Sequence, residues 1–202
     1  MTDPKSKSGN APSAKTTLRQ AALARRDALG PDRRATASAA IAARAIAVVE
    51  GASPRSIASY LPIRSECDPG AIAAWAIGRG ITVALPAAID ANTIVFRKYV
   101  PGDPLGAGGF GTLAPTPDAP AIDPDFIVAP VVGFDRRGAR LGHGRGFYDR
   151  AVAALHARGL TPPFLGVAFA AQEVGSAASE PHDVRLDWIV TENETIDLRE
   201  TA

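Results

Sequence analysis

The segment RLGHGRGFYDR, residues 140–150, combines flexible backbone with positive charge. Glycines at positions 142, 144 and 146 let the chain approach a ligand without side-chain interference. The helix expected to follow presents unpaired N–H groups and a partial positive charge at its N-terminus, which suits phosphate. Arginine adds forked, charge-assisted hydrogen bonds. The segment therefore predicts a pocket for phosphate groups such as those of ATP; the alternative is a tight strand-to-helix turn with a solvated basic rim.

The known nucleotide-binding motifs do not fit this segment. Gly133 and Gly138 have the outer spacing of a Walker loop, but Ala139 and Arg140 stand where that loop has Lys and Ser or Thr. The three closely spaced glycines also depart from the dinucleotide-binding fingerprint. If the segment binds phosphate, it belongs to another class of loop.

Two carboxylates are candidates for a metal site. Asp149 falls in the first turn of the expected helix, where an acid is favourable by itself, but beside phosphates a bare carboxylate would repel the ligand. Magnesium, which binds one or two carboxylates together with phosphates, removes this conflict. Asp183, in PHDVRLD, is the candidate for a second carboxylate; the alternative is a loop aspartate that caps a turn.

Three basic residues near the N-terminus share one face of an expected helix. Lys15, Arg19 and Arg26 fall within roughly 40° of one another when each residue turns the helix by about 100°. This stripe would contribute to a ligand site if it faced the glycine segment. A solvated helix face explains it equally well.

The composition of the whole chain limits the classes of protein. Its 202 residues suit one domain, and the formal net charge of +1 gives no global field that would favour nucleic acid or an anionic membrane. The arginines at positions 136, 137, 140, 145 and 150 therefore form a local basic cluster. No apolar run approaches the roughly 20 residues that span a bilayer. Cys67 is the single cysteine, which excludes an internal disulfide and a cysteine-rich zinc site.

Residues 1–14 lack an apolar signal core and are expected to form a disordered tail before a single domain over residues 15–202, with the protein in the cytoplasm. Strands and helices are expected to alternate along this domain. The expected helices cover 16–29, 31–51 (Asp32 as cap, Gly51 as stop), 68–80 (Asp68 as cap) and 147–158. The expected strands cover 56–62, 81–86, 93–100, 125–134, 164–169 and 187–191, and the Pro- and Gly-rich segment 101–125 is expected to hold little regular structure.

The strands are apolar throughout and do not alternate with polar residues. This pattern predicts an α/β fold: a single three-layer domain with a mainly parallel sheet covered by helices on both faces. In such sheets the ligand crevice lies beyond the carboxyl ends of the strands. The glycine segment follows such a strand and precedes such a helix.

The stretch VVGFDRRGARLGHGRGFYDR resembles the signature of the 5-formyltetrahydrofolate cyclo-ligase family, also called methenyltetrahydrofolate synthetases. Three further pieces match the family in the expected order. They are a Lys-x-x-x-Arg helix at Lys15 and Arg19, a strand leading to Glu66 in YLPIRSECD, and HDVRLDWIVTE near the C-terminus. The pieces span about residues 15–192, and their combination is highly specific.

The resemblance implies a three-layer α/β enzyme that uses ATP and magnesium to convert 5-formyltetrahydrofolate, with or without a polyglutamate tail, to 5,10-methenyltetrahydrofolate, releasing ADP and phosphate. Asp149 and Asp183 would hold magnesium, and Arg145 and Tyr148 would act in catalysis. The residues implied to contact ATP are Lys15, Arg19, Arg140, Leu141, Gly142, His143, Gly144, Arg145, Gly146, Phe147 and Tyr148. Those implied to border the folate are Arg19, Leu61, Glu66, His143, Gly144, Arg145, Gly146 and Phe147. We expect no nucleic-acid or membrane partner, and a monomer or weak homo-oligomer.

Two positions depart from the family pattern. The family's Gly-Tyr-Tyr-Asp has Phe147 as its first aromatic residue here, which removes one hydroxyl but keeps a ring that can stack. Ala114 stands where the family commonly has a glutamate before a proline, so a role for that acid is not carried over. The alternative function is a relative of the same fold that binds sugar phosphates, CoA or RNA. The near-zero net charge and the few aromatic residues argue against RNA.

Overall fold

An eight-stranded sheet forms the middle of the domain in the computed structural model, which describes residues 13–109, 111–177, 180 and 183–199. The strand order is β12-β11-β10-β7-β1-β2-β3-β6. Three strands of this sheet pair in antiparallel fashion: β6 (Ala121–Ile122) and β12 (Thr195–Asp197) at the two edges, and β3 (Ile94–Lys98) between β2 and β6. The central strands run parallel, which confirms the prediction of a mainly parallel sheet. They are β1 (Ser56–Ala58), β2 (Thr82–Ala88), β7 (Phe126–Pro130), β10 (Phe164–Val167) and β11 (Trp188–Val190).

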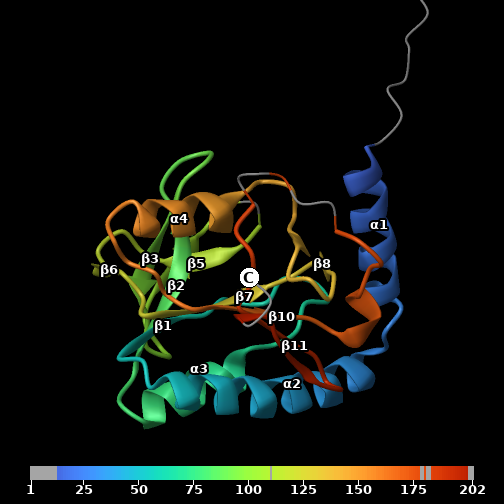
Figure 1. Ribbon diagram of the computed structural model, residues 1–202. Helices are drawn as coiled ribbons and strands as arrows, with labels where there is room; N and C mark the ends of the chain where they lie inside the picture. Colours follow the sequence, from blue (N-terminus) through green and yellow to red (C-terminus); the bar gives the residue numbers. More distant parts are fainter. Residues whose placement is uncertain (1–12, 110, 178–179, 181–182, 200–202) are drawn as a thin grey trace, which may run out of the picture.

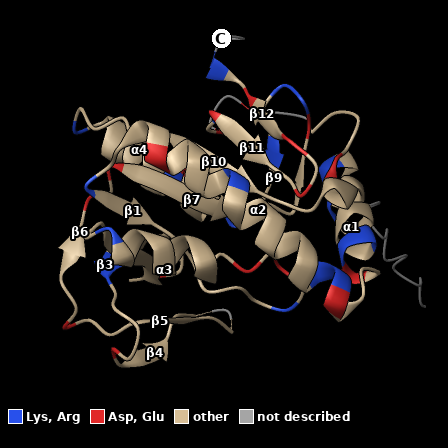
Figure 2. Ribbon diagram, turned by 90° about the horizontal axis from the view of Figure 1, so that it is seen from below, with Lys and Arg blue, Asp and Glu red and all other residues tan. Residues whose placement is uncertain are grey.

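Helices cover both faces of this sheet. α2 (Pro31–Ala52) and α3 (Gly70–Gly78) lie on one face, and α4 (Phe147–His156) lies on the other (Figure 1). Seen from below, α2 and α3 are in front of the sheet (Figure 2). Along β7, Phe126 and Val128 pack into the core on the α2–α3 side, whereas Ile127 and Ala129 pack into the core on the α4 side. Both faces of the strand are buried, which explains its continuous apolar sequence and confirms the three-layer prediction.

α1 (Ala14–Asp27) lies at the side of the sheet, next to the short 3-10 helix η1 (Ala170–Gln172) (Figure 1). Ser13 caps its first turn by accepting a hydrogen bond from Thr16 N (3.2 Å). Of the predicted tail, residues 1–12 lie outside the described residues. The last two residues of the predicted tail are Ser13, which is the cap, and Ala14, which is the first residue of α1.

α2 is, among the described residues, the one helix that is long and apolar enough to cross a membrane by length and composition. Its fully buried residues Ile41, Ala45 and Val49 pack in the core between helix and sheet. Core helices pass the same test of length and composition. The packing therefore assigns the apolar face of α2 to the domain core.

Several predicted helix boundaries are wrong by one or two residues. α2 has Gly30 as its N-cap and Pro31 in its first turn, so Asp32 lies within the first turn and is not the cap. Gly51 lies inside the helix, which stops before Ser53, a residue in the left-handed conformation at φ 49°. Asp68 is not the N-cap of α3, although its Oδ1 accepts a hydrogen bond from Gly70 N (2.8 Å) where the helix begins.

Three strand predictions are also corrected. The predicted strand over 125–134 is two strands, because the chain leaves the main sheet after β7 and β8 (Gly133–Phe134) pairs with β9 (Arg140–Leu141). The segment 101–125 is more regular than predicted, with β4 (Leu105–Ala107) and β5 (Leu113–Pro115) paired and β6 on the sheet edge. β12 is a strand that the sequence pattern did not predict.

Candidate active site

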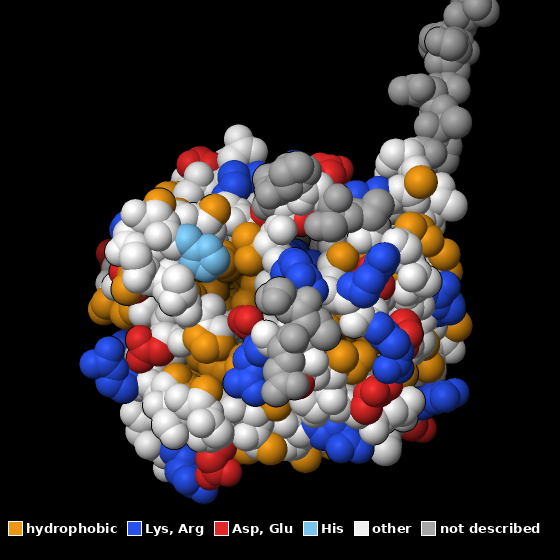
Figure 3. Space-filling model, viewed as in Figure 1, with side chains coloured by type: hydrophobic (Ala, Val, Ile, Leu, Met, Phe, Trp, Pro, Cys, Tyr) orange, Lys and Arg blue, Asp and Glu red, His pale blue; other side chains and the backbone are white. Residues whose placement is uncertain are grey.

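A cavity of about 500 Å³ lies beyond the carboxyl ends of β1, β2 and β7. Open α/β sheets bind ligands at this position. One side of the cavity is formed by basic residues of α1 and by residues 140–147, here called the glycine loop. The rest of the lining, here called the apolar wall, is largely apolar and comes from residues that follow β1, from β2 and β3, and from the β4–β5 hairpin. On the face shown in Figure 3, hydrophobic side chains line a hollow, and side chains of both charges are interspersed around it.

The glycine loop depends on backbone conformations that favour glycine. Gly144 has φ 88° and Gly146 has φ 63°, both in the left-handed region. Gly146 is the N-cap of α4, so the loop delivers the chain directly to a helix N-terminus that borders the cavity. Arg19 Nε donates a hydrogen bond to Gly142 O (2.6 Å), which fixes the loop to α1. The predicted combination of glycine backbone, arginine and helix terminus is therefore present around one cavity.

Arg140 and Asp149, which both line the cavity, form a largely buried ion pair. Arg140 Nη2 lies 2.6 Å from Asp149 Oδ1, and the two side chains are 8% and 13% exposed. Val184 N donates a second hydrogen bond to the same oxygen (3.0 Å). Burial lowers the pKa of Arg140, which the charge of Asp149 partly opposes. Arg140 Nε is buried and has no hydrogen-bond partner among the described residues, and the guanidinium carbon lies 5.0 Å from the ring centroid of Phe164.

Lys15 and Asp183 form the second ion pair in the cavity. Lys15 Nζ lies 2.7 Å from Asp183 Oδ2 and 3.5 Å from Glu180 Oε1. Asp149 lines the same cavity, so the two carboxylates predicted to hold metal share one site. In the part of the chain that the structure describes, no group of three or more His, Cys, Asp or Glu residues could enclose a metal ion. Two carboxylates fit magnesium, which in nucleotide sites takes one or two carboxylates together with phosphate oxygens and water.

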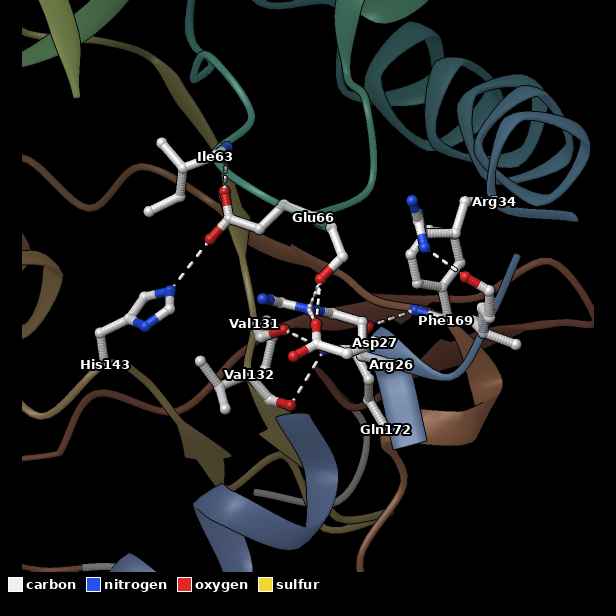
Figure 4. A network of polar contacts seen from close by, with 12 residues as sticks. Arg26, Asp27, Arg34, Ile63, Glu66, Val131, Val132, His143, Phe169 and Gln172 are labelled. Carbon is white, nitrogen blue, oxygen red and sulfur yellow. Dashed lines mark hydrogen bonds and ion pairs between the residues drawn. The ribbon is translucent and has the colours of Figure 1, made fainter. Parts of the chain in front are cut away.

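Glu66 connects the two sides of the cavity. Its side chain is only 5% exposed, and Oε2 accepts a hydrogen bond from Ile63 N (3.0 Å) (Figure 4). Oε1 lies 3.0 Å from His143 Nε2, so the acid contacts the glycine loop. Each carboxylate oxygen has a second acceptor position, so Glu66 can still accept hydrogen bonds from a ligand.

Tyr148 contributes a buried hydroxyl to the cavity lining. Its ring packs beside Phe96 and Phe164, with centroid distances of 6.4 and 6.1 Å. The hydroxyl oxygen is buried and has no hydrogen-bond partner among the described residues. Burial raises the pKa of Tyr148 and the charge of Glu66 raises it further, while the charge of Arg140 partly opposes the shift. The residue is therefore a neutral hydroxyl that can donate a hydrogen bond, and it is unsuited to act as a base.

The structure brings nearly all of the predicted site residues to this cavity. Leu141 is the exception: its side chain is fully buried in a cluster with Ala22 and Val132, so the predicted contact between this side chain and ATP is not supported. Leu141 lies in β9 and is an ordinary residue of the hydrophobic core. The predicted residues that do line the cavity are Lys15, Arg19, Leu61, Glu66, Arg140, Gly142, His143, Gly144, Arg145, Gly146, Phe147, Tyr148, Asp149 and Asp183.

The basic cluster and the basic stripe are not single functional units. Of the five clustered arginines, only those at positions 140 and 145 line the cavity. Arg136 instead pairs with Glu173 and Glu194 at the surface. Within the stripe, Lys15 and Arg19 reach the cavity, but Arg26 is buried at 1% exposure and does not line it.

Most residues missed by the sequence reasoning belong to the apolar wall. Small and apolar side chains carry no chemical signature, although Pro86 ends a predicted strand and Ala88 follows it closely, where a crevice is expected. Ala114 is buried and does not line the cavity, whereas its neighbours in the hairpin do. The missed lining residues are Tyr60, Ile63, Arg64, Pro86, Ala88, Ile94, Gly108, Gly109, Thr112, Leu113, Pro130 and Glu180.

Comparisons with known proteins identify the family of this chain. A 5-formyltetrahydrofolate cyclo-ligase from Mycolicibacterium smegmatis is 37% identical over 150 residues, which cover 69% of this chain and 74% of the relative. The cyclo-ligase of Haemophilus influenzae is 26% identical over 74% of this chain and 82% of its own length. The solved structure of Aquifex aeolicus 5,10-methenyltetrahydrofolate synthetase superposes with a TM-score of 0.77 at 28% identity, covering 93% of this chain and 94% of that chain. The sequence model of the 5-formyltetrahydrofolate cyclo-ligase family matches residues 11–192, and the chain belongs to this family of enzymes.

Proposed function

We propose that this protein converts 5-formyltetrahydrofolate to 5,10-methenyltetrahydrofolate with ATP and magnesium, releasing ADP and phosphate. One observation carries the proposal. A single cavity combines a phosphate-type glycine loop, two carboxylates and, beside apolar lining residues, the acid Glu66. Relatives named 5-formyltetrahydrofolate cyclo-ligase support the folate assignment.

ATP would bind along the basic residues of α1 and the glycine loop. The backbone N–H groups at the start of α4 and the glycine loop would face its phosphates, as helix N-termini do in other phosphate sites. Arg19 and Lys15 approach this side of the cavity from α1, and Arg145 lies between two glycines of the loop. The apolar and aromatic surfaces would hold the rings of the two substrates.

Magnesium would be held by Asp149 and Asp183 together with the phosphates of ATP. When bound, the metal would neutralise charge that develops on the phosphates during transfer. In the structure these carboxylates are paired with Arg140 and Lys15.

The folate would lie along the apolar wall with its pterin edge facing Glu66. A pterin edge presents N–H donors, and Glu66 offers a buried carboxylate with free acceptor positions. Leu61, Ile63 and Leu113 provide apolar surface on this side of the cavity. Arg19, His143 and the loop residues up to Phe147 line the cavity and would border both ligands.

The chemistry requires positioning and does not require a protein nucleophile. The γ-phosphoryl group of ATP moves to the formyl oxygen, which makes that oxygen a good leaving group and leaves ADP. The folate N10 then attacks the formyl carbon, the C–O bond breaks, phosphate departs and N10 loses its proton. Arg145 would stabilise the charge of the transferring phosphoryl group, and the neutral Tyr148 hydroxyl would donate a hydrogen bond within the site.

The proposal extends to the setting of the reaction. The enzyme would act in the cytoplasm on free or polyglutamylated folate, as a monomer or weak homo-oligomer, without a nucleic-acid or membrane partner. Nothing in the cavity favours a sugar phosphate, CoA or RNA over the folate, and these ligands serve as alternatives in the test.

The function is tested by following the absorbance of 5,10-methenyltetrahydrofolate and the release of ADP in one assay. We expect both signals only when ATP, magnesium and 5-formyltetrahydrofolate are all present. Omission of any one should abolish both. Equal ADP release without the folate, or with a sugar phosphate, CoA or RNA in its place, would reject the proposal.

A further inference from the structure

Building on the proposed function, we propose that Arg26 is a positioning residue for folate binding. It lies outside the cavity but holds Ser65, the residue that precedes Glu66. Through this contact, residues 61–67, here called the acid loop, would present the Glu66 carboxylate to the pterin edge. Arg26 would therefore affect binding of the folate and leave binding of ATP largely unchanged.

Arg26 is a buried cation with few partners. Its side chain is only 2% exposed, and Nε donates a hydrogen bond to Ser65 Oγ (3.0 Å). The same Ser65 hydroxyl donates to Asp27 Oδ1, which lies 3.7 Å from Arg26 Nε. Arg26 Nη1 is buried and has no partner among the described residues. Figure 4 shows Arg26 and Asp27 beside the acid loop, close to Glu66.

This arrangement is a poor source of stability. A buried charge is costly unless its ion pairs and hydrogen bonds are good, and replacement by an apolar side chain of similar volume is often neutral or stabilising. The paired Asp27 carboxylate is 60% exposed, so solvent screens the ion pair, and one guanidinium nitrogen is left unsatisfied. A requirement for loop position explains the buried arginine better than a requirement for fold stability.

α1 contacts both loops that border the cavity. Two helical turns before Arg26, Arg19 Nε donates to Gly142 O in the glycine loop (2.6 Å). The next residue in that loop, His143, lies 3.0 Å from Glu66 Oε1. Together with the Arg26–Ser65 hydrogen bond, these contacts close a ring through the helix and the two loops. The ring fixes the acid between the ATP side and the folate side of the cavity.

Loss of the Arg26–Ser65 contact opens this ring at the acid loop. The loop turn itself is held by Glu66 N, which donates to Ile63 O (3.1 Å), and by Ile63 N, which donates to the Glu66 carboxylate (3.0 Å). In Ser65→Ala, which also removes the hydrogen bond to Asp27, this turn can shift as a unit, whereas in Arg26→Met the Ser65–Asp27 hydrogen bond alone still holds Ser65. The carboxylate would then keep its local hydrogen bond but lose its fixed direction toward the ligand.

Arg26→Met and Ser65→Ala test the contact, and Arg26→Lys tests whether an amine can replace the guanidinium. Arg25→Met is the matched control, because Arg25 is the neighbouring arginine on α1 and donates hydrogen bonds to Ala171 O (2.6 Å) and Glu173 O (2.9 Å), outside the acid loop. For each variant, kcat and the KM values for 5-formyltetrahydrofolate and ATP are measured at saturating magnesium. Thermal unfolding gives the stability of each variant.

We expect Arg26→Met and Ser65→Ala to raise the KM for the folate by about fivefold or more, the size of one lost hydrogen bond, with the KM for ATP changed by less than about twofold. Arg26→Lys should recover part of the folate binding. In a Glu66→Gln background, Ser65→Ala should add little, because the contact acts through that carboxylate. Equal changes in both KM values, an unchanged folate KM, or the same effect from Arg25→Met at equal stability would overturn the proposal.

Hydrogen exchange of the acid-loop amides separates this proposal from the proposed function. Exchange at residues 63–67 should become faster in Arg26→Met and Ser65→Ala but not in Arg25→Met, whether or not the protein turns over folate. If the wild type shows no folate turnover, the proposed function fails while exchange still tests the anchor. If the wild type is active and neither exchange nor folate KM changes in the variants, the positioning role alone is wrong.

Discussion

Asp149→Asn separates a structural acid from a magnesium ligand. The substitution keeps the shape of the side chain and removes one negative charge. In the structure Asp149 Oδ1 accepts hydrogen bonds from Arg140 Nη2 (2.6 Å) and Val184 N (3.0 Å), and the asparagine oxygen can still accept both. The change therefore leaves the geometry in place and removes the charge that compensates a largely buried guanidinium.

The expected loss of stability follows from this burial. Removing one partner of a buried ion pair costs about 3–5 kcal/mol, and the retained hydrogen bonds should reduce this to about 2 kcal/mol. For a chain of this size, the melting temperature should fall by about 4–8 °C. Asp123→Asn is the matched control. Its ion pair with Arg158 (2.7 Å) is exposed, so the same substitution should cost less than about 1 kcal/mol.

The kinetic effect should exceed what the stability loss explains. At a temperature where Asp149→Asn is fully folded, we expect the magnesium concentration for half-maximal rate to rise by at least about tenfold, since even loss of a group behind a metal ligand typically costs about 10–100-fold. The turnover number should fall as well. Magnesium titrations of activity, with circular dichroism as the control for folding, measure both.

Two results would refute this reasoning. Wild-type magnesium dependence and turnover in the folded variant would remove Asp149 from the metal site and leave Asp183 as the remaining candidate. The stability argument fails separately if Asp149→Asn costs as much in an Arg140→Met background as in the wild type, because the cost would then not come from the ion pair.

Three further predictions concern single positions. Arg145→Ala should raise the KM for ATP by about tenfold or more. Arg136→Ala should change this KM by less than about twofold, because Arg136 pairs with Glu173 and Glu194 away from the cavity. Similar KM values for the two variants would mean that the arginines act only through their combined charge and that Arg145 makes no specific contact with ATP. Gly144→Ala should cost about 1–2 kcal/mol in thermal unfolding because of its φ of 88°, whereas Gly142→Ala, with only Arg140 Nη1 at 3.7 Å from the new carbon, should be tolerated. Burial raises the pKa of the Cys67 thiol to about 12, so it should stay protonated and resist a thiol reagent at pH 8 until the protein is unfolded, and rapid labelling of the native protein would contradict this.

The layered fold could be predicted because its signal is local. β7 reads as an uninterrupted apolar run since both of its faces are buried, and α4 begins immediately after glycines that its N-terminus requires. β12 could not be predicted, because Thr195–Asp197 is only three residues long and gains its order from pairing with β11. Short edge strands of this kind carry almost no periodic pattern.

The candidate site was predictable where residue chemistry and order along the chain were informative. A shared helix face was not sufficient to predict which side chains reach the site. Lys15, Arg19 and Arg26 lie on one helix face, yet the last is buried beneath the acid loop, because that loop covers the end of α1. The pairing of Arg140 with Asp149 likewise depends on how β9 and α4 meet, which no local pattern specifies.

The transfer of a phosphoryl group to the formyl oxygen can be tested with 5-formyltetrahydrofolate labelled with ¹⁸O in the formyl group. The labelled folate is converted in a single turnover with ATP and magnesium, and the released phosphate is analysed by mass spectrometry. Because the C–O bond of the formyl group breaks after phosphorylation, one ¹⁸O atom should appear in each phosphate that accompanies 5,10-methenyltetrahydrofolate. Formation of this product with unlabelled phosphate would mean that ATP is hydrolysed by water, and would contradict activation of the formyl oxygen in this cavity.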